Sequence, residues 1–195
     1  MSASGIVGLK DLYIAEVTKD DATGMTFSTP EKLAPGLEAK ITNNVDSQVI
    51  YADDVPVEVA TTQGEIKVEI NVSDLEPAKY ARLLGKTKNA DGAVADKLDD
   101  VPPYFALMFR SKKANGAYRY MVLYKGRFTP GDEDYKTQQG KADVQNSSVT
   151  GTFIKPEGRD EIRYIMDSDD EDANPTVIAN WFTQVYQPTG GTTGS

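Results

Sequence analysis

The sequence predicts a mainly β fold, an antiparallel β-sandwich or partial barrel with two flanking α-helices. Short stretches of alternating apolar and polar residues recur along the chain and are separated by turn residues, which is typical of antiparallel strands. Only two segments show the three- and four-residue spacing of a helix face. At 195 residues and 39% hydrophobic content the chain suits one domain.

The clearest strand signal covers residues 65–72. Its apolar members are Ile66, Val68, Ile70 and Val72. Glu65, Lys67 and Glu69 alternate with them. Because successive side chains of a strand point to opposite faces, one face of this strand is predicted to be buried and the other hydrated.

A hairpin is predicted from residues 104–111 and 118–128, because Asn115-Gly116 between them can supply the positive φ angles of a tight turn. Pro56 has no amide hydrogen, so it should lie either in an edge strand or at the beginning of its strand. Further strands are expected near residues 9–17, 37–42, 48–52, 55–61, 147–155 and 161–166.

Two segments are predicted to be helices. Ser73 and Glu76 have the spacing of a capping box, Pro77 would lie in the first turn, and Gly85 can end this helix. The second helix should begin near Asn174-Pro175. Its apolar stripe consists of Val177, Ile178, Trp181, Phe182 and Val185. Trp181 and Phe182 are therefore interpreted as core residues that pack on the sheet and not as a ligand platform.

Composition argues against enzymatic activity and against a cofactor. The chain has no His and no Cys, which removes the commonest general bases, nucleophiles and transition-metal ligands. The acidic run at residues 167–172 fails as an EF-hand, because Asp172 stands where that loop needs Gly, and it is expected to be a solvated loop. Phosphate-binding, dinucleotide-binding and hydrolase motifs are also missing from the sequence.

The formal net charge of −9 disfavours tight binding of DNA, whose phosphates would be repelled. No apolar run is long enough to cross a bilayer, and residues 1–5 lack the features of a signal peptide, so we expect a protein that is made and kept in the cytoplasm, without a membrane partner. Residues 1–188 are predicted to form one domain, and residues 189–195 a flexible Gly/Thr-rich tail.

Several motifs resemble, in order and spacing, those of the major tail tube proteins of long-tailed, non-contractile bacteriophages. The similarity is spread over residues 5–187. The motifs are Gly8-Leu9-Lys10-Asp11-Leu12-Tyr13, Tyr51-Ala52-Asp53-Asp54, Ala106-Leu107-Met108-Phe109-Arg110-Ser111, Asn115-Gly116, Tyr118-Arg119-Tyr120, Lys125-Gly126-Arg127-Phe128, Thr150-Gly151-Thr152-Phe153 and Trp181-Phe182.

The resemblance implies a structural virion protein whose hexameric rings close one continuous β-barrel and stack into a hollow tail tube. DNA and a tape-measure protein would pass through the lumen without sequence-specific binding. Tail terminator and distal tail proteins would contact the tube ends. The protein would be in the host cytoplasm during assembly and in the virion tail afterwards.

Two sets of residues are candidates for roles in such a tube. Glu65, Lys67 and Glu69 are predicted to face the lumen as part of an acidic wall that DNA slides past. Tyr51, Asp53 and Asp54, within the polar region of residues 43–62, are predicted to contact the next ring. The alternative function is a β-sandwich binding module of carbohydrate-binding or adhesin type, for which ten Tyr residues could supply ligand contacts.

Overall fold

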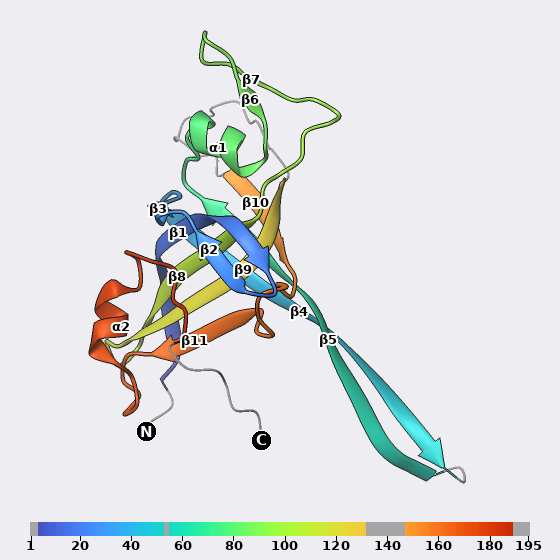
Figure 1. The fold of residues 1–195 in the computed structure, drawn as a ribbon. Helices are drawn as coiled ribbons and strands as arrows, with labels where there is room; N and C mark the ends of the chain where they lie inside the picture. The colour runs from blue at the N-terminus through green and yellow to red at the C-terminus, as the bar shows by residue number, and fades with distance from the viewer. Residues whose placement is uncertain (1–3, 53–54, 132–146, 189–195) are drawn as a thin grey trace, which may run out of the picture.

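The computed structural model describes residues 4–52, 55–131 and 147–188, and Figure 1 shows their arrangement. Strands dominate it, as predicted. In chain order the elements are β1 (Ile6–Asp21), β2 (Gly24–Phe27), β3 (Glu31–Lys32), β4 (Gly36–Ala52), β5 (Val55–Val72), α1 (Pro77–Leu83), β6 (Thr87–Lys88), β7 (Val94–Ala95), β8 (Phe105–Lys113), β9 (Tyr118–Pro130), β10 (Ser147–Phe153), β11 (Arg163–Asp167) and α2 (Pro175–Asn180).

The main sheet is antiparallel and runs in the order β2-β1-β8-β9-β10-β5-β4. In addition, β3 pairs with β1 and β11 pairs with β9. On the side away from β8, strand β9 pairs with two strands. Its residues 119–123 pair with β11, and its residues 126–130 pair with β10. The sheet therefore divides at β9 into two layers.

The two ends of the sheet approach each other and form a partial barrel. The Leu33 amide donates a hydrogen bond to the Leu12 carbonyl at 2.9 Å, which extends the β3–β1 contact toward the start of β4. Gly36, the first residue of β4, lies so close to β1 that an added Cβ would be 2.7 Å from the Leu9 side chain. From Gly36 onward β4 has no pairing strand other than β5 among the described residues.

Two hydrophobic clusters hold these layers together. The inner core fills the partial barrel, and its fully buried members include Phe105, Phe128, Phe153, Ile66, Ile70 and Leu107. The outer core lies beneath α2 and contains Met108, Tyr120, Val122, Tyr124, Trp181 and Val185. Along β8 the inner-core residues Leu107 and Phe109 alternate with Ala106 and Met108 of the outer core, so β8 is buried on both faces.

The hairpin of β8 and β9 is confirmed, but its turn differs from the prediction. Gly116 has a positive φ of 89°, whereas the φ of Asn115 is not positive. The Lys113 amide donates to the Ala117 carbonyl, so the loop has three residues with Gly in the left-handed position. The Asn115 side chain instead accepts a hydrogen bond from the Ala117 amide at 3.1 Å.

Both predicted helices exist but are shorter than expected. Helix α1 is capped by Glu76 without a side-chain hydrogen bond, so the predicted capping box is wrong. The Ser73 amide instead donates a hydrogen bond to the Pro35 carbonyl, so Ser73 continues the pairing of β5 with the start of β4. Gly85 follows α1 with a φ of 67°, as predicted.

Helix α2 begins as predicted, with the Asn174 side chain accepting a hydrogen bond from the Thr176 amide at 2.9 Å. It ends at Asn180, and Trp181 and Phe182 lie just beyond its end. The apolar stripe was therefore a correct indication of packing and an incorrect indication of helix length. Within the part of the chain described, neither helix is long and apolar enough to span a membrane.

Strands predicted as separate pieces are continuous. Residues 37–42 and 48–52 belong to β4, and residues 55–61 and 65–72 belong to β5. Pro56 is the second residue of β5, as its lack of an amide hydrogen predicts. The polar residues between the predicted pieces do not break the strands, because the two strands pair with each other there.

Candidate functional site

Strands β4, β5, β10 and the end of β9 share a polar face on the side away from the inner core. The register aligns its side chains in rows that cross all four strands. One row consists of Thr42, Lys67, Thr152 and Arg127, and the next of Lys40, Glu69, Thr150 and Thr129. The structure thus brings Glu65, Lys67 and Glu69 together on one hydrated surface opposite buried apolar neighbours.

The charged residues that the structure describes on this polar face balance, and the acidic wall stays a prediction. The acidic residues are Glu38, Glu65 and Glu69, and the basic residues are Lys40, Lys67 and Arg127. Lys40 lies 3.4 Å from Glu69. Glu65 accepts a hydrogen bond from the Asn44 side chain at 3.2 Å, and hydrogen bonds from its own backbone amide and from Asn44 lower its pKa. The four strands therefore present a polar, nearly neutral surface.

Both borders of the four-strand polar face are open. On one side, β4 lacks an outer partner in the described residues. On the other side, residues 127–130 of β9 pair only with β10 within the described part of the chain, because the pairing with β8 ends at Gly126. Unpaired strand edges carry free amide and carbonyl groups that can pair with another chain. The polar face thus has two edges at which neighbouring copies could add.

Beyond the body, β4 and β5 continue as a two-stranded ribbon, here called the arm (residues 45–52 and 55–63), which projects away from the rest of the molecule in Figure 1. Every arm residue whose exposure is described is exposed. A bulge at its base sets Asn44 against both Gly64 and Glu65. An isolated two-stranded ribbon is marginally stable in water, so this arm is expected to be covered by another surface.

One side of the arm carries three valines, together with the polar residues Ser47, Thr61 and Gln63. Strand alternation places Val45 and Val49 on the same side of β4 as Ile41, which packs on the inner core. The register sets Val59 directly opposite Val49. The valines at positions 45, 49 and 59 are 40 to 61% exposed. The arm thus extends the core-facing side of the sheet into solvent, where its own chain does not cover it.

Of the predicted contact residues, only Tyr51 lies within the described structure. Tyr51 belongs to the last residues of β4, and its side chain is outside what the structure describes. Asp53 and Asp54 lie outside the described residues altogether. Their location in the connection between β4 and β5 follows from the chain, and their role stays a prediction.

The acidic run after β11 is not simply solvated. Lys113, whose side chain is 7% exposed, lies 3.0 Å from Asp167 and 2.7 Å from Asp169. Arg119 donates two hydrogen bonds to Asp167, at 2.6 and 2.7 Å. The Arg119 guanidinium, followed by Lys113, lowers the pKa of Asp167 to about 2. This network ties the turn after β11 to the β8–β9 hairpin and is structural.

Trp181 and Phe182 lie over the outer face of β8 and β9. Trp181 is 1% exposed and stacks on Tyr186, with ring centroids 5.1 Å apart. Phe182 is half-buried against Tyr13, with ring centroids 4.7 Å apart. The Tyr124 hydroxyl donates to the Tyr186 carbonyl at 2.8 Å, and burial raises the pKa of this hydroxyl. The chain after α2 is thereby held on the sheet.

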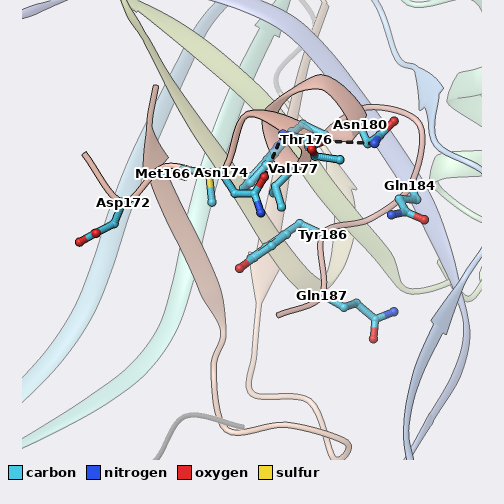
Figure 2. Close-up of a pocket in the computed structure, with 10 residues that line it drawn as sticks. Met166, Asp172, Asn174, Thr176, Val177, Asn180, Gln184, Tyr186 and Gln187 are labelled. Atoms are coloured by element: carbon cyan, nitrogen blue, oxygen red, sulfur yellow. Dashed lines mark hydrogen bonds between the residues drawn. The ribbon is translucent and has the colours of Figure 1, made fainter. Parts of the chain in front are cut away.

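A cavity of about 300 Å³ lies between the end of β11, α2 and the segment that follows it. Figure 2 shows that its lining is rich in side-chain amides. Two of these amides hold α2 itself, since Asn174 caps the helix and the Asn180 amide donates to the Thr176 carbonyl at 3.1 Å. Among the residues that the structure describes, no cluster of three or more metal-ligating side chains occurs.

Sequence reasoning expected residues 43–62 to protrude and the sheet to have unpaired edges, but it did not show that β4 and β5 run on as one continuous ribbon or that β4 and β9 carry the edges. The alternation of residues 55–72 indicates a strand but does not show where its partner ends. The sequence did contain a signal for a long strand. Residues 55–63 include the β-forming residues Val55, Val59 and Thr61 and few residues that favour a turn.

Comparison with known proteins agrees with this architecture. A family model described as phage tail tube protein matches residues 8–189, which is most of the chain. A search of curated protein sequences found no significant match.

Proposed function

The chain belongs to the phage tail tube protein family, whose role is structural, and we propose that it forms hexameric rings that stack into the tube of a long, non-contractile tail. In this proposal the protein is not an enzyme, and the tube is the conduit for DNA ejection. The observation that carries the proposal is the four-strand polar face with an open edge on each side.

The directions of the strands allow neighbouring copies in a ring to pair in antiparallel orientation. Strands β9, β10, β5 and β4 alternate in direction, because each neighbouring pair is antiparallel. A copy rotated about a ring axis keeps the direction of its strands along that axis. The free edge of β4 would therefore meet the free edge of β9 in the next copy in antiparallel orientation, and six such contacts would close a barrel without edges.

The polar face would then line the lumen. Its balanced charges and threonines are hydrated, so passing DNA would find neither a basic groove that holds it nor a strongly repelling wall. Glu65, Lys67 and Glu69 would be lumen residues. A tape-measure protein would occupy the same space before DNA passes, and terminator and distal tail proteins would cover the open ends.

The arm would connect stacked rings. The side with Val45, Val49 and Val59 is suited to burial against another copy, and the other side carries charged and polar residues such as Asp46 and Gln48 that can remain hydrated. Tyr51, Asp53 and Asp54 at the arm's end would take part in this contact. Residues 1–188 would form the tube domain and residues 189–195 a tail.

Electron microscopy of the purified protein at rising concentration tests the proposal, with six-fold rings or tubes as the expected result. A cysteine at Lys40 together with one at Thr129 should give, on oxidation, a covalent ladder that ends at the hexamer, since the native chain contains no Cys. Because the strands of a closed barrel are staggered, a cysteine at Lys40 with one at Arg127, and one at Thr42 with one at Thr129, test the contact in shifted registers. A protein that stays monomeric and binds sugars saturably would contradict the proposal and favour a binding module.

A further inference from the structure

An exposed apolar side chain is displayed at the end of the molecule opposite the arm. The apical loop (residues 86–101) follows α1 and includes β6 and β7. Figure 1 shows this loop and the arm leaving the body at opposite ends. Leu98 in the loop is fully exposed, and Val101 is 64% exposed. Single exposed apolar residues are common on protein surfaces, so the support beneath this one decides its meaning.

Leu98 lies on a clasped turn. The Asp100 carboxylate accepts a hydrogen bond from the Lys97 amide at 2.8 Å, and the Asp100 amide donates to the Lys97 carbonyl at 3.3 Å. These two bonds close a tight turn around Leu98. The backbone that carries Leu98 is therefore held in a defined place, which reduces the entropy that a partner must remove on binding.

The loop is also fastened to the body at its base. Lys86, whose side chain is 8% exposed, lies 2.6 Å from Asp96 and donates a hydrogen bond to the Tyr80 hydroxyl at 3.1 Å. Gly85 has a positive φ and lies so close to the Val101 carbonyl that a side chain would not fit there. Both ends of the loop are thus pinned, and the loop is preorganised for contact.

We propose that the arm of one copy docks on the apical loop of a copy in the next ring, with Val45, Val49 and Val59 covering Leu98 and Val101. This inference rests on the proposed tube and names the surface that receives the arm. Because the two surfaces differ and lie at opposite ends of the molecule, the contact is heterologous and repeats without closing, as an open stack requires.

Apolar contact should carry this docking. The apical loop contains Asp91 and Asp99 as well as Lys88 and Lys97, so it offers no single sign of charge to the acidic Asp46 and Glu58 of the arm. Stacked tubes are therefore expected to survive a rise in salt from about 0.1 M to about 1 M, where the screening length falls from about 10 Å to about 3 Å.

Disulfide trapping between two singly substituted proteins tests the contact directly. Val59→Cys protein mixed with Leu98→Cys protein should give, on oxidation of the assembled tubes, a dimer band that contains one chain of each kind. Val59→Cys mixed with Ile165→Cys serves as the matched control, because Ile165 is exposed on β11. Equal trapping at Ile165, or none at Leu98 in well-formed tubes, would overturn the inference and leave the tube proposal intact.

A charge placed at Leu98 separates stacking from ring formation. Leu98→Asp should leave six-fold rings and abolish long tubes, whereas Ile165→Asp should leave both, and circular dichroism checks that each variant folds. Normal tubes from Leu98→Asp, or loss of rings together with tubes, would refute the docking on the next ring. If the unsubstituted protein forms neither rings nor tubes, the proposed function itself fails.

Discussion

The body and the arm are built from the same two strands but differ in what surrounds them. In the body, Ile66, Val68 and Ile70 of β5 are fully buried in the inner core. In the arm, Val59 of the same strand is 61% exposed, and no described side chain is buried. The alternating apolar residues of β5 thus stabilise the fold in the body, whereas in the arm they remain exposed and can be covered by another copy.

This difference teaches that folding and polymerisation can be altered separately. A side chain in the body contributes to the free energy of unfolding because folding removes it from water. An arm side chain remains in water in the single copy, so it contributes little until another copy covers it. Variants in the two regions should therefore give opposite patterns of monomer stability and tube formation.

Removing the arm should have the largest effect on assembly. Replacement of residues 45–63 by a short Gly-containing turn is expected to leave a folded monomer with an unchanged far-UV circular dichroism shape and to abolish tubes completely in electron micrographs. The reason is that all of these residues whose exposure is described are exposed in the single copy. Tubes of normal length from this variant would show that the arm is not an assembly element.

Truncating the inner core should have the largest effect on folding. Phe128 is fully buried and contacts Phe105 and Phe153, with ring centroids 6.3 and 5.9 Å apart. Phe128→Ala should lower the free energy of unfolding by about 3–5 kcal/mol, measured by urea denaturation. In the arm, Val59→Ala should change it by less than about 0.5 kcal/mol. Similar losses at both positions would remove the distinction between body and arm.

Breaking the ion-pair network of the body should have an intermediate effect. Asp167→Asn is expected to lower the free energy of unfolding by about 1–2 kcal/mol, because it leaves the nearly buried Lys113 with one carboxylate partner fewer. Asp172→Asn, an exposed neighbour, is the matched control. An equal loss from both variants would show that the effect is not due to the network.

The same carboxylate makes a pH prediction. The pKa of Asp167 is lowered from 3.8 to about 2 in the folded protein, so its stabilisation is fully present above the unfolded value and is lost as the pH falls from about 4 to about 2. Denaturation measured across this range should show a smaller decline for Asp167→Asn than for the native chain. Parallel curves would contradict this assignment.

Reversing charge on the polar face should have the smallest effect on the monomer. Glu65→Lys combined with Glu69→Lys should alter the free energy of unfolding by less than about 0.5 kcal/mol, because both side chains lie at the surface. Under the proposal that these side chains face the lumen, the added positive charge should slow DNA release from assembled particles. Unchanged assembly and unchanged release would count against the placement of these residues in the lumen.

Much of the body could be predicted from local pattern. The strand at residues 65–72, the hairpin after Ser111 and the burial of Trp181 follow from alternation, from Gly116 and from an apolar stripe. The capping box at Ser73 failed because that residue is still held by Pro35, a partner distant in the sequence. Helix α2 was predicted too long, since packing of Trp181 on the sheet does not require helical backbone.

The candidate surfaces were less predictable. Alternation places Glu65 on a wet face, but a solvent face looks the same whether it is an outer surface or the wall of a channel. The open edges of β4 and β9 could not be found either, because an edge is defined by the strand that is missing beside it.

By itself the sequence determined the β class, the buried face of the strand at residues 65–72, and the chemistry that the chain lacks, because these depend on side-chain type and on neighbours along the chain. Only the tertiary structure decided that β4 and β5 outrun the body, that the polar face has balanced charge, and that Leu98 lies at the end opposite the arm. The physical reason is that strand pairing joins distant residues, so where pairing stops depends on the whole sheet and not on any local pattern.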